Sequence, residues 1–123
     1  MKFDILSNQI IRCAIEVHKS LGPGLLESTY EECLSYELKQ NKITHETQPS
    51  LPVKYKNILL DCGYRIDILV DNKIIIELKS VEKLMPIHTA QLLTYMKLSN
   101  IKIGLLMNFN VMRLKDGMKR LVL

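Results

Sequence analysis

Two acidic side chains and a lysine, Asp67, Glu77 and Lys79, form the clearest chemical pattern in this sequence. Residues 64–70 and 74–79 alternate as two strands do, and a three-residue loop would join them as a hairpin. Because directly opposed residues share a face, this register places Asp67 opposite Glu77, at about 5 Å between their Cβ atoms. Carboxylates that close repel each other unless something positive lies between them. The spacing therefore predicts a divalent metal site.

The same hairpin has a plainer interpretation as a half-solvated strand pair with ordinary surface charges. Arg65 would lie across from Lys79, so diagonal ion pairs to the two acids could form, each worth less than about 1 kcal/mol. Against this, Leu69 shares the polar face, so an apolar layer should cover it and desolvate the charges. The opposite face of the first strand is predicted to be apolar, formed by Ile66, Ile68 and Val70.

Two predicted helices, at residues 86–98 and 25–40, each add polar side chains. His88, Gln91 and Tyr95 are spaced to share one helix face, although such a stripe is also typical of an ordinary helix flank. Glu27 stands in the first turn of the second helix, where an acid is often only a favourable partner of the helix dipole. His18, just before the Gly22-Pro23-Gly24 break, is typical of a histidine at the edge of a core.

Composition describes one small domain over residues 1–123. The chain is 47% hydrophobic, carries a formal net charge of +4 and has a pI of about 9.0, a mild balance that is compatible with a polyanionic partner. Three scattered cysteines without a CxxC pair favour a reducing, cytoplasmic location. No apolar run is long enough to cross a bilayer, so we expect no membrane partner.

Hydrophobic spacing predicts the elements that would position these side chains. Helices are expected at residues 5–21, 25–40 and 86–98. Besides the central hairpin, strands are expected at 51–55, as a sheet edge, at 103–107, and at 111–114 and 118–123, as a last hairpin turning at Asp116-Gly117. The order ααβββαβββ predicts the α/β (α+β) class, with a mixed sheet flanked by helices.

A longer pattern runs through almost the whole chain. It begins at Val17-His18 and Leu21, and Gly24, Glu27 and Tyr30 then supply a GxxExxY signature. It continues at Gln48, Leu51-Pro52-Val53, Tyr55, Tyr64-Arg65-Ile66-Asp67, Glu77-Leu78-Lys79, Gln91-Leu92-Leu93-Thr94-Tyr95, Gly104-Leu105-Leu106 and Asn108-Phe109. Taken together, residues 5–122 resemble the bacterial GxxExxY protein family, which is similar to the PD-(D/E)xK nuclease superfamily.

The resemblance implies a restriction-endonuclease-like core, and it implies roles for Asp67, Glu77 and Lys79. Asp67 and Glu77 match the metal-ligand acids of the superfamily, and Lys79 matches its catalytic lysine. Ile66 stands where the superfamily name expects proline, a position that makes no chemical contribution. With these roles, the Leu78 carbonyl is expected as a third oxygen ligand of the metal.

The resemblance extends to residues on the helices. Gln91 and Tyr95 match the QxxxY element of the RecB-like exonuclease branch, and Glu27 matches the acid on the preceding helix, where it could complete the metal shell or hold a second ion. A looser match makes His18 an additional metal ligand. The resemblance thus implies a catalytic set of Asp67, Glu77, Lys79, Gln91, Tyr95 and Glu27.

The expected function is hydrolysis of phosphodiester bonds, with DNA as the expected substrate and Mg²⁺ or Mn²⁺ as the cofactor. The alternative is a non-catalytic module that keeps the nuclease fold and binds nucleic acid or protein. A third interpretation treats the acids and the lysine as a structural ion-pair network. Because the domain is small, a homodimer or a partner protein is plausible. Basic residues are dispersed, most densely at Lys119-Arg120, and no sequence-reading module is evident.

Overall fold

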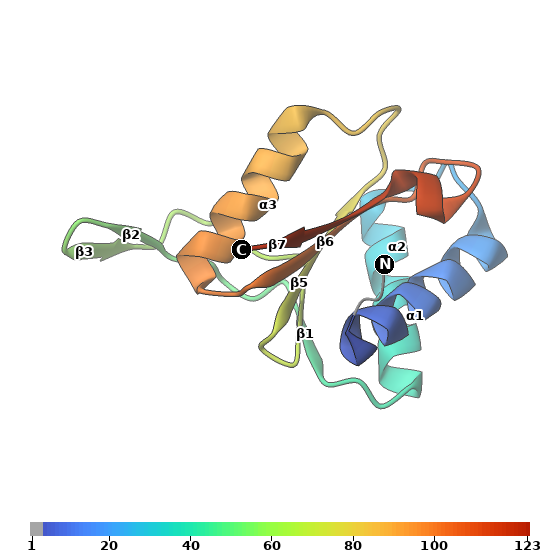
Figure 1. Cartoon of the computed structure of the whole chain (residues 1–123), viewed down its shortest axis with the longest axis horizontal. Coiled ribbons are helices and arrows are strands. Elements are labelled where there is room, and N and C mark those ends of the chain that lie inside the picture. The colour runs from blue at the N-terminus through green and yellow to red at the C-terminus, as the bar shows by residue number, and fades with distance from the viewer. Residues whose placement is uncertain (1–3) are drawn as a thin grey trace.

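The computed structural model describes residues 4–123 as an α+β fold built on a mixed sheet (Figure 1). Its helices are α1 (Ile5–Leu21), α2 (Glu27–Gln40) and α3 (Pro86–Ser99), with a short 3-10 helix, η1 (Leu114–Gly117). Its strands are β1 (His45–Thr47), β2 (Val53–Tyr55), β3 (Ile58–Leu60), β4 (Ile68–Val70), β5 (Ile74–Lys79), β6 (Ile103–Asn108) and β7 (Met118–Val122). The predicted fold class is confirmed, and all three helices lie within two residues of their predicted bounds.

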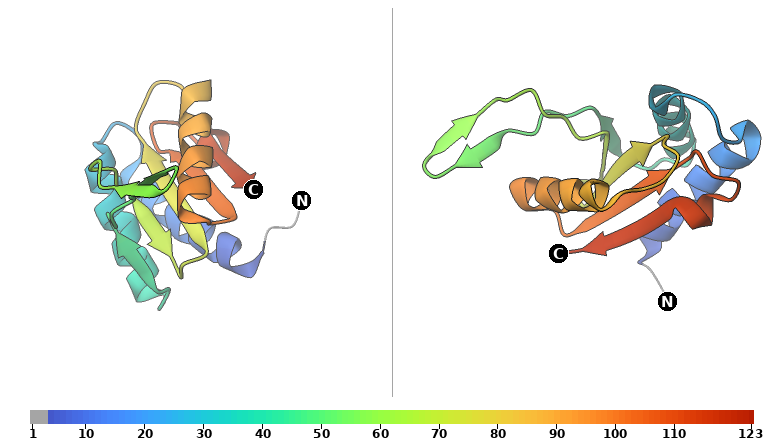
Figure 2. Two further views of the ribbon diagram at one scale, coloured as in Figure 1. Left: turned by 90° about the vertical axis from the view of Figure 1, so that its left-hand side faces the viewer. Right: turned by 90° about the horizontal axis from the view of Figure 1, so that it is seen from above.

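Five strands form the main sheet in the order β1-β4-β5-β6-β7. Strands β5 and β6 run parallel, and α3 supplies the crossover that parallel neighbours require. The other neighbours in this sheet pair antiparallel. Helices α1 and α2 pack on one face and α3 on the other, so the central strand β5 is covered on both sides (Figure 2).

The alternation of β5 follows the sequence pattern. Ile74, Ile76 and Leu78 pack in the core beneath α1 and α2, whereas Ile75 packs in the smaller core beneath α3. The hairpin from β4 to β5 turns through three residues, as predicted. Asp71 and Asn72 adopt positive φ angles there, which aspartate and asparagine tolerate better than most residues.

The break between α1 and α2 is held by a buried tyrosine. The hydroxyl of Tyr30 donates to the Gly22 carbonyl at 2.6 Å and accepts from the Leu25 amide at 3.1 Å. Its ring stacks on Phe109 at 4.6 Å between centroids. Gly22 has a φ of 71°, a conformation that glycine adopts without strain. These contacts fix the first turn of α2, and with it Glu27, against the end of the sheet.

The predicted strand at 64–70 is wrong in its first half. β4 begins only at Ile68, because the chain bends at Asp67 and the alternation is interrupted there. Ile66 consequently packs in the core beneath α3, not with Ile68 beneath α1 and α2. Arg65 forms an isolated bridge with Ser50 and does not lie across from Lys79.

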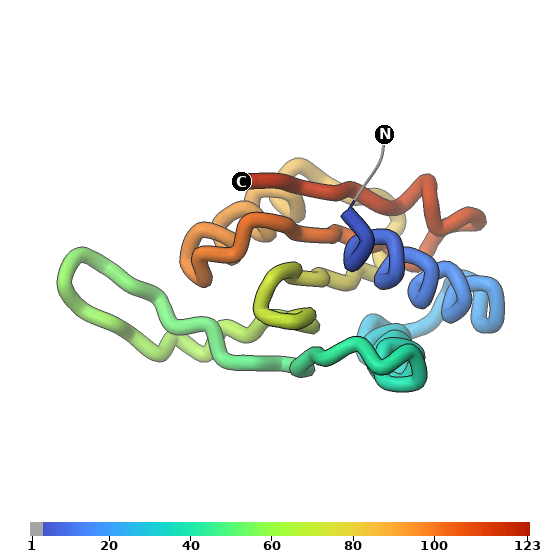
Figure 3. The backbone as a smooth tube through the Cα atoms, turned by 60° about the horizontal axis from the view of Figure 1, so that its bottom comes forward, coloured from blue at the N-terminus to red at the C-terminus, as the bar shows by residue number. Residues whose placement is uncertain are grey.

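Three further differences concern strand partners. The last hairpin was wrong, because residues 114–117 form η1 and β7 pairs antiparallel with β6. β1 was missed, since its three residues are mostly exposed and carry no apolar alternation. The strand predicted at the sheet edge, 51–55, instead contributes β2 to a separate two-stranded sheet with β3 (Figure 3). Within residues 4–123, the helices are too short or too polar to span a bilayer.

Candidate active site

Asp67 and Glu77 meet where the ladder between β4 and β5 stops. The Asp67 amide donates to Oε2 of Glu77 at 2.8 Å, and the Leu78 amide donates to Oδ2 of Asp67 at 2.8 Å. The last backbone pair of the hairpin is Ile68 with Ile76, so these side chains replace the next rungs. The bend at Asp67 lets side-chain carboxylates accept these backbone amides in place of carbonyl groups. The two bonds hold both carboxylates in position. The structure thus brings the two predicted acids together.

Glu77 is a strongly desolvated acid with an acidic neighbour. Only 5% of the residue is exposed. Burial, followed by the nearby Asp67 carboxylate, raises the pKa of Glu77 from 4.5 to about 8, although Lys79 and the Asp67 amide oppose the shift. The site therefore favours a proton on Glu77 near neutral pH unless another positive charge is present.

Lys79 is hydrogen-bonded to a short chain of polar side chains on α3. Its Nζ donates to Oε1 of Gln91 at 3.5 Å, and Nε2 of Gln91 donates to the Tyr95 hydroxyl at 3.3 Å. Tyr95 is 8% exposed, and burial, then the Glu77 charge, raises its pKa. This chain connects Lys79 to a rigid helix. His88 from the same predicted stripe instead accepts a bond from the Met85 amide at the start of α3.

An acidic rim lies on the α2 side of the pair. A cavity of about 350 Å³ is lined by Glu27, Ser28, Glu31, Gln48, Asp67 and Leu78. Nε2 of Gln48 donates to Oε1 of Glu31 at 2.6 Å and to Oδ1 of Asp67 at 3.2 Å. Burial raises the pKa of Glu31, while the Gln48 bond lowers it. Glu31 is not among the residues predicted from the sequence, although it stands four residues after Glu27 and so shares its helix face.

Glu27 ties α2 to the end of β5. Its Oε2 accepts from the Ser80 amide at 3.3 Å, and the Ser80 hydroxyl donates to the Leu25 carbonyl at 2.6 Å. Ser80 directly follows Lys79. The carboxylate of Glu27 is exposed and lines the same cavity as Asp67, so the structure brings Glu27 to the rim of the site.

His18 lies in a different place. It belongs to the core beneath α1 and α2, where its Nε2 donates to the Val111 carbonyl at 2.8 Å and its ring lies 6.1 Å from that of Phe109. Only 7% of it is exposed. The structure does not bring His18 to Asp67 and Glu77. The imidazole is buried and bonded to the Val111 carbonyl, in the loop between β6 and η1.

The predicted diagonal ion pairs do not form. Within residues 4–123, side-chain ion pairs join Lys73 to Asp71 and Arg120 to Asp4, both outside the site. Within the described residues, the ion pair of this hairpin lies in its turn, between Lys73 and Asp71, and not at Asp67 or Glu77.

The donor set at the pair suits a hard divalent cation. Across the described residues 4–123, no group of three His, Cys, Asp or Glu side chains converges as a ligand set. Backbone can supply the third oxygen, because the N–H and C=O of a strand residue point to the same edge, and the Leu78 N–H points to Asp67. Two carboxylates and a carbonyl are oxygen ligands of the type that Mg²⁺ and Mn²⁺ prefer. The residues present fit such an ion.

Comparison with known proteins gives one match. The family model of the PD-(D/E)XK nuclease superfamily matches residues 4–121. Searches of curated proteins and of solved structures returned no match. The matched range contains the acid pair, Lys79, the polar chain beneath α3 and the rim on α2.

Proposed function

The chain belongs to the PD-(D/E)XK nuclease superfamily, and from this premise we propose that it is a divalent-metal-dependent nuclease acting on DNA. The family supports nucleic acid as the substrate class and phosphodiester hydrolysis as the reaction. DNA, the metal requirement and the roles of individual residues are parts of the proposal. The narrower expectations, a GxxExxY protein and a RecB-like branch, stay predictions.

One observation carries the proposal. At the end of the β4–β5 ladder the Asp67 amide donates to Glu77 and the Leu78 amide donates to the Asp67 carboxylate, both at 2.8 Å, and Lys79 follows on the same face of β5. A buried pair of acids costs free energy in the absence of a cation, since both desolvation and mutual repulsion oppose ionisation. An arrangement of this kind is expected where a positively charged ligand is to be bound.

Each residue then has a definable task. Asp67, Glu77 and the Leu78 carbonyl would hold Mg²⁺ or Mn²⁺, whose charge neutralises the phosphate and acidifies the attacking water. Lys79 would donate hydrogen bonds to that water or to a phosphate oxygen. Gln91 would orient the Lys79 amine, and Tyr95 would hold the Gln91 amide. Glu27 and Glu31, which line the cavity beside Asp67 from α2, would orient water molecules next to the metal ion.

Cleavage assays with matched variants test the proposal. Linear and circular DNA are incubated with wild type, Glu77→Gln and Lys79→Ala, with Mn²⁺, Mg²⁺ or a chelator. We expect metal-dependent cleavage by wild type and a loss of at least about 10²-fold in each variant. Glu16→Gln and Lys102→Ala make the same chemical changes at exposed positions and should retain activity. Wild-type rates in folded Glu77→Gln and Lys79→Ala would refute the assignment.

One observation favours the alternative of a non-catalytic binding module, namely that within residues 4–123 no third His, Cys, Asp or Glu side chain joins Asp67 and Glu77 in a ligand set. Such a module would bind nucleic acid with an affinity that falls linearly against the logarithm of salt concentration, without turnover. Metal-dependent cleavage that is lost in Glu77→Gln would exclude it.

A further inference from the structure

The two-stranded sheet of β2 and β3 forms an arm, defined here as residues 51–65, that projects from the body of the molecule (Figure 3). Both ends of the arm return to the site. Leu51 packs in the core beneath α3, and Arg65 precedes Asp67 by two residues. A two-stranded sheet is only marginally stable alone. Exposed segments that a rigid scaffold positions often carry binding residues, so the arm is a candidate binding surface.

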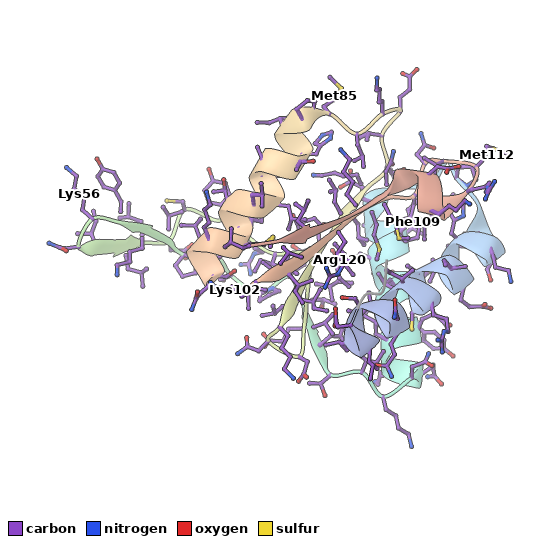
Figure 4. All side chains as sticks on the ribbon, viewed as in Figure 1. Lys56, Met85, Lys102, Phe109, Met112 and Arg120 are labelled. Atoms are coloured by element: carbon purple, nitrogen blue, oxygen red, sulfur yellow. The ribbon has the colours of Figure 1, made fainter. Side chains whose placement is uncertain are left out.

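The arm exposes aromatic and basic side chains together. Tyr55 is 58% exposed and Tyr64 is 48% exposed. Lys56, at the end of the arm (Figure 4), lies with its Nζ 5.4 Å from the centroid of the Tyr55 ring. The arm carries three cationic residues, Lys54, Lys56 and Arg65, against one acid, Asp61. Its charge therefore complements a polyanion.

Tyr64 connects the arm to the active site. Its ring meets that of Tyr95 edge-on, at 6.2 Å between centroids. Tyr95 accepts from Gln91, which in turn accepts from Lys79. The half-exposed ring of Tyr64 thus lies at the outer end of the polar chain that orients the lysine.

Arg65, the residue after Tyr64, adds a positive charge at the base of the arm. Its Nη1 donates to the Gln48 carbonyl at 3.0 Å and to the Ser50 hydroxyl at 3.3 Å. Gln48 also bonds to Asp67 through its side chain. Arg65 is exposed and partly held, so its remaining N–H groups are free to meet a phosphate within a few residues of the acid pair.

We propose that Tyr64 is a stacking platform for an unpaired base, and that the arm guides a single strand of nucleic acid to the acid pair. The inference deepens the proposed function and rests on it, because it names the form of the substrate. Exposed aromatic rings beside cations bind single strands through base stacking and phosphate contacts, whereas a duplex hides the faces of its internal bases. Single strands, flaps and frayed ends are accordingly the expected substrates.

A second copy of this chain is the competing occupant of the arm. β3 exposes Ile58, Leu59 and Leu60, and it lacks the proline and lysine that accompany β2 at Pro52 and Lys54. Three residues give little area for a stable dimer, and aliphatic side chains do not explain the tyrosines beside the site. Nucleic acid is therefore favoured, and self-association is an outcome of the test.

The test measures binding without cleavage. A labelled deoxythymidine oligonucleotide and a blunt duplex are titrated with wild type, Tyr64→Ala, Tyr64→Phe and Tyr36→Ala in a chelator. Tyr36 is 61% exposed on α2 and serves as the matched control. We expect Tyr64→Ala to weaken single-strand binding about tenfold, in line with the loss of one stacked base. Tyr64→Phe should stay within about twofold of wild type because phenylalanine also stacks.

Intrinsic fluorescence gives a second readout, because the chain has five tyrosines and no tryptophan. Stacking should quench part of the tyrosine emission of wild type, and this part should be missing in Tyr64→Phe. Wild-type single-strand affinity in Tyr64→Ala, or an equal loss toward the blunt duplex, would overturn the inference. So would a wild-type dimer that Leu59→Glu dissociates while Tyr64→Ala binds DNA normally.

The two proposals fail separately. If wild type cleaves DNA but Tyr64→Ala binds single strands normally, the arm inference is wrong and the nuclease assignment stands. If Tyr64→Ala loses single-strand binding but wild type never cleaves, Tyr64 still stacks on single strands, as in a binding module, and the nuclease assignment is wrong.

Discussion

Asn108 is the last residue of β6, and Glu77 lies two residues before the end of its parallel neighbour β5; both are buried, yet their surroundings differ. Asn108 is 2% exposed and fully engaged with neutral backbone: its Oδ1 accepts from the amides of Val81 and Asn110, and its Nδ2 donates to the Val81 carbonyl. Glu77 is 5% exposed and faces another carboxylate. Burial alone therefore does not identify a functional polar group. A charge whose neighbours oppose its ionisation is the better candidate for a functional group.

Removing Asn108 should cause the largest loss of stability. Asn108→Ala leaves the Val81 amide and carbonyl and the Asn110 amide without their partner, and unfolding should become easier by about 3 kcal/mol. Urea unfolding followed by circular dichroism measures this change. If the free energy of unfolding falls by less than about 0.5 kcal/mol, as for an ordinary surface substitution, the hydrogen bonds of Asn108 do not stabilise the fold.

Adding a divalent cation should reverse the penalty at Glu77. At a concentration 100 times the dissociation constant, Mn²⁺ should stabilise wild type by about 2.7 kcal/mol, because it binds only the folded chain. Calorimetric titration should give a heat of binding with wild type and none with Glu77→Gln. Asn108→Ala, measured under conditions where it is folded, should still bind. Equal heats in wild type and Glu77→Gln would remove the metal from the acid pair.

Without metal, Glu77→Gln should stabilise the fold by about 2 kcal/mol at pH 8, since it removes a desolvated charge while keeping an oxygen for the Asp67 amide. Thermal melting in a chelator measures the gain. Glu16→Gln, at an exposed position, should change stability by less than about 0.5 kcal/mol. Destabilisation by Glu77→Gln would mean that the carboxylate contributes favourably to the metal-free fold.

The pH dependence follows from the same shift. The folded pKa of Glu77, about 8, lies above its unfolded value of 4.5, so the folded chain binds the extra proton between these values. The contribution of Glu77 to the free energy of unfolding is fully present below pH 4.5. It is lost as the pH rises to about 8. The difference between wild type and Glu77→Gln should therefore vanish near pH 4.5. A difference that is independent of pH would contradict the shift.

Gln91→Ala should have the smallest effect among these changes. It releases the Lys79 amine from Tyr95 without removing either one, so cleavage should fall about tenfold while the metal affinity is retained. Gln91→Glu, which keeps an acceptor for Lys79, should recover part of the rate. Loss of Mn²⁺ binding in Gln91→Ala would place Gln91 with the metal ligands instead.

Much of the frame could be predicted from local pattern. The helical spacing placed α1 at its observed bounds, and the alternation predicted over residues 74–79 agrees with β5, where Ile75 and Ile76 pack in different cores. The three-residue loop set the register that brings Asp67 to Glu77. What failed was non-local. β7 was given the wrong partner because pairing with β6 depends on which sheet edge remains free once α3 has crossed over.

The candidate site divides in the same way. Residues on one strand or one helix face, such as Lys79 and Gln91, could be grouped by spacing. Gln48 and Arg65 could not, because their positions depend on the bend at Asp67 and on the bridge to Ser50. His18 was drawn to the site by motif, but its partners Phe109 and Val111 come from the other end of the chain.

The sequence by itself determined the periodic elements, the hairpin register and the residue types available for chemistry, because these follow from side-chain spacing over a few residues. Only the tertiary structure decided which polar groups lose water and which neighbours they then face. Desolvation and the distances between charges depend on every element packed around a site, and they made Glu77 an acid with a raised pKa and Asn108 a neutral clamp.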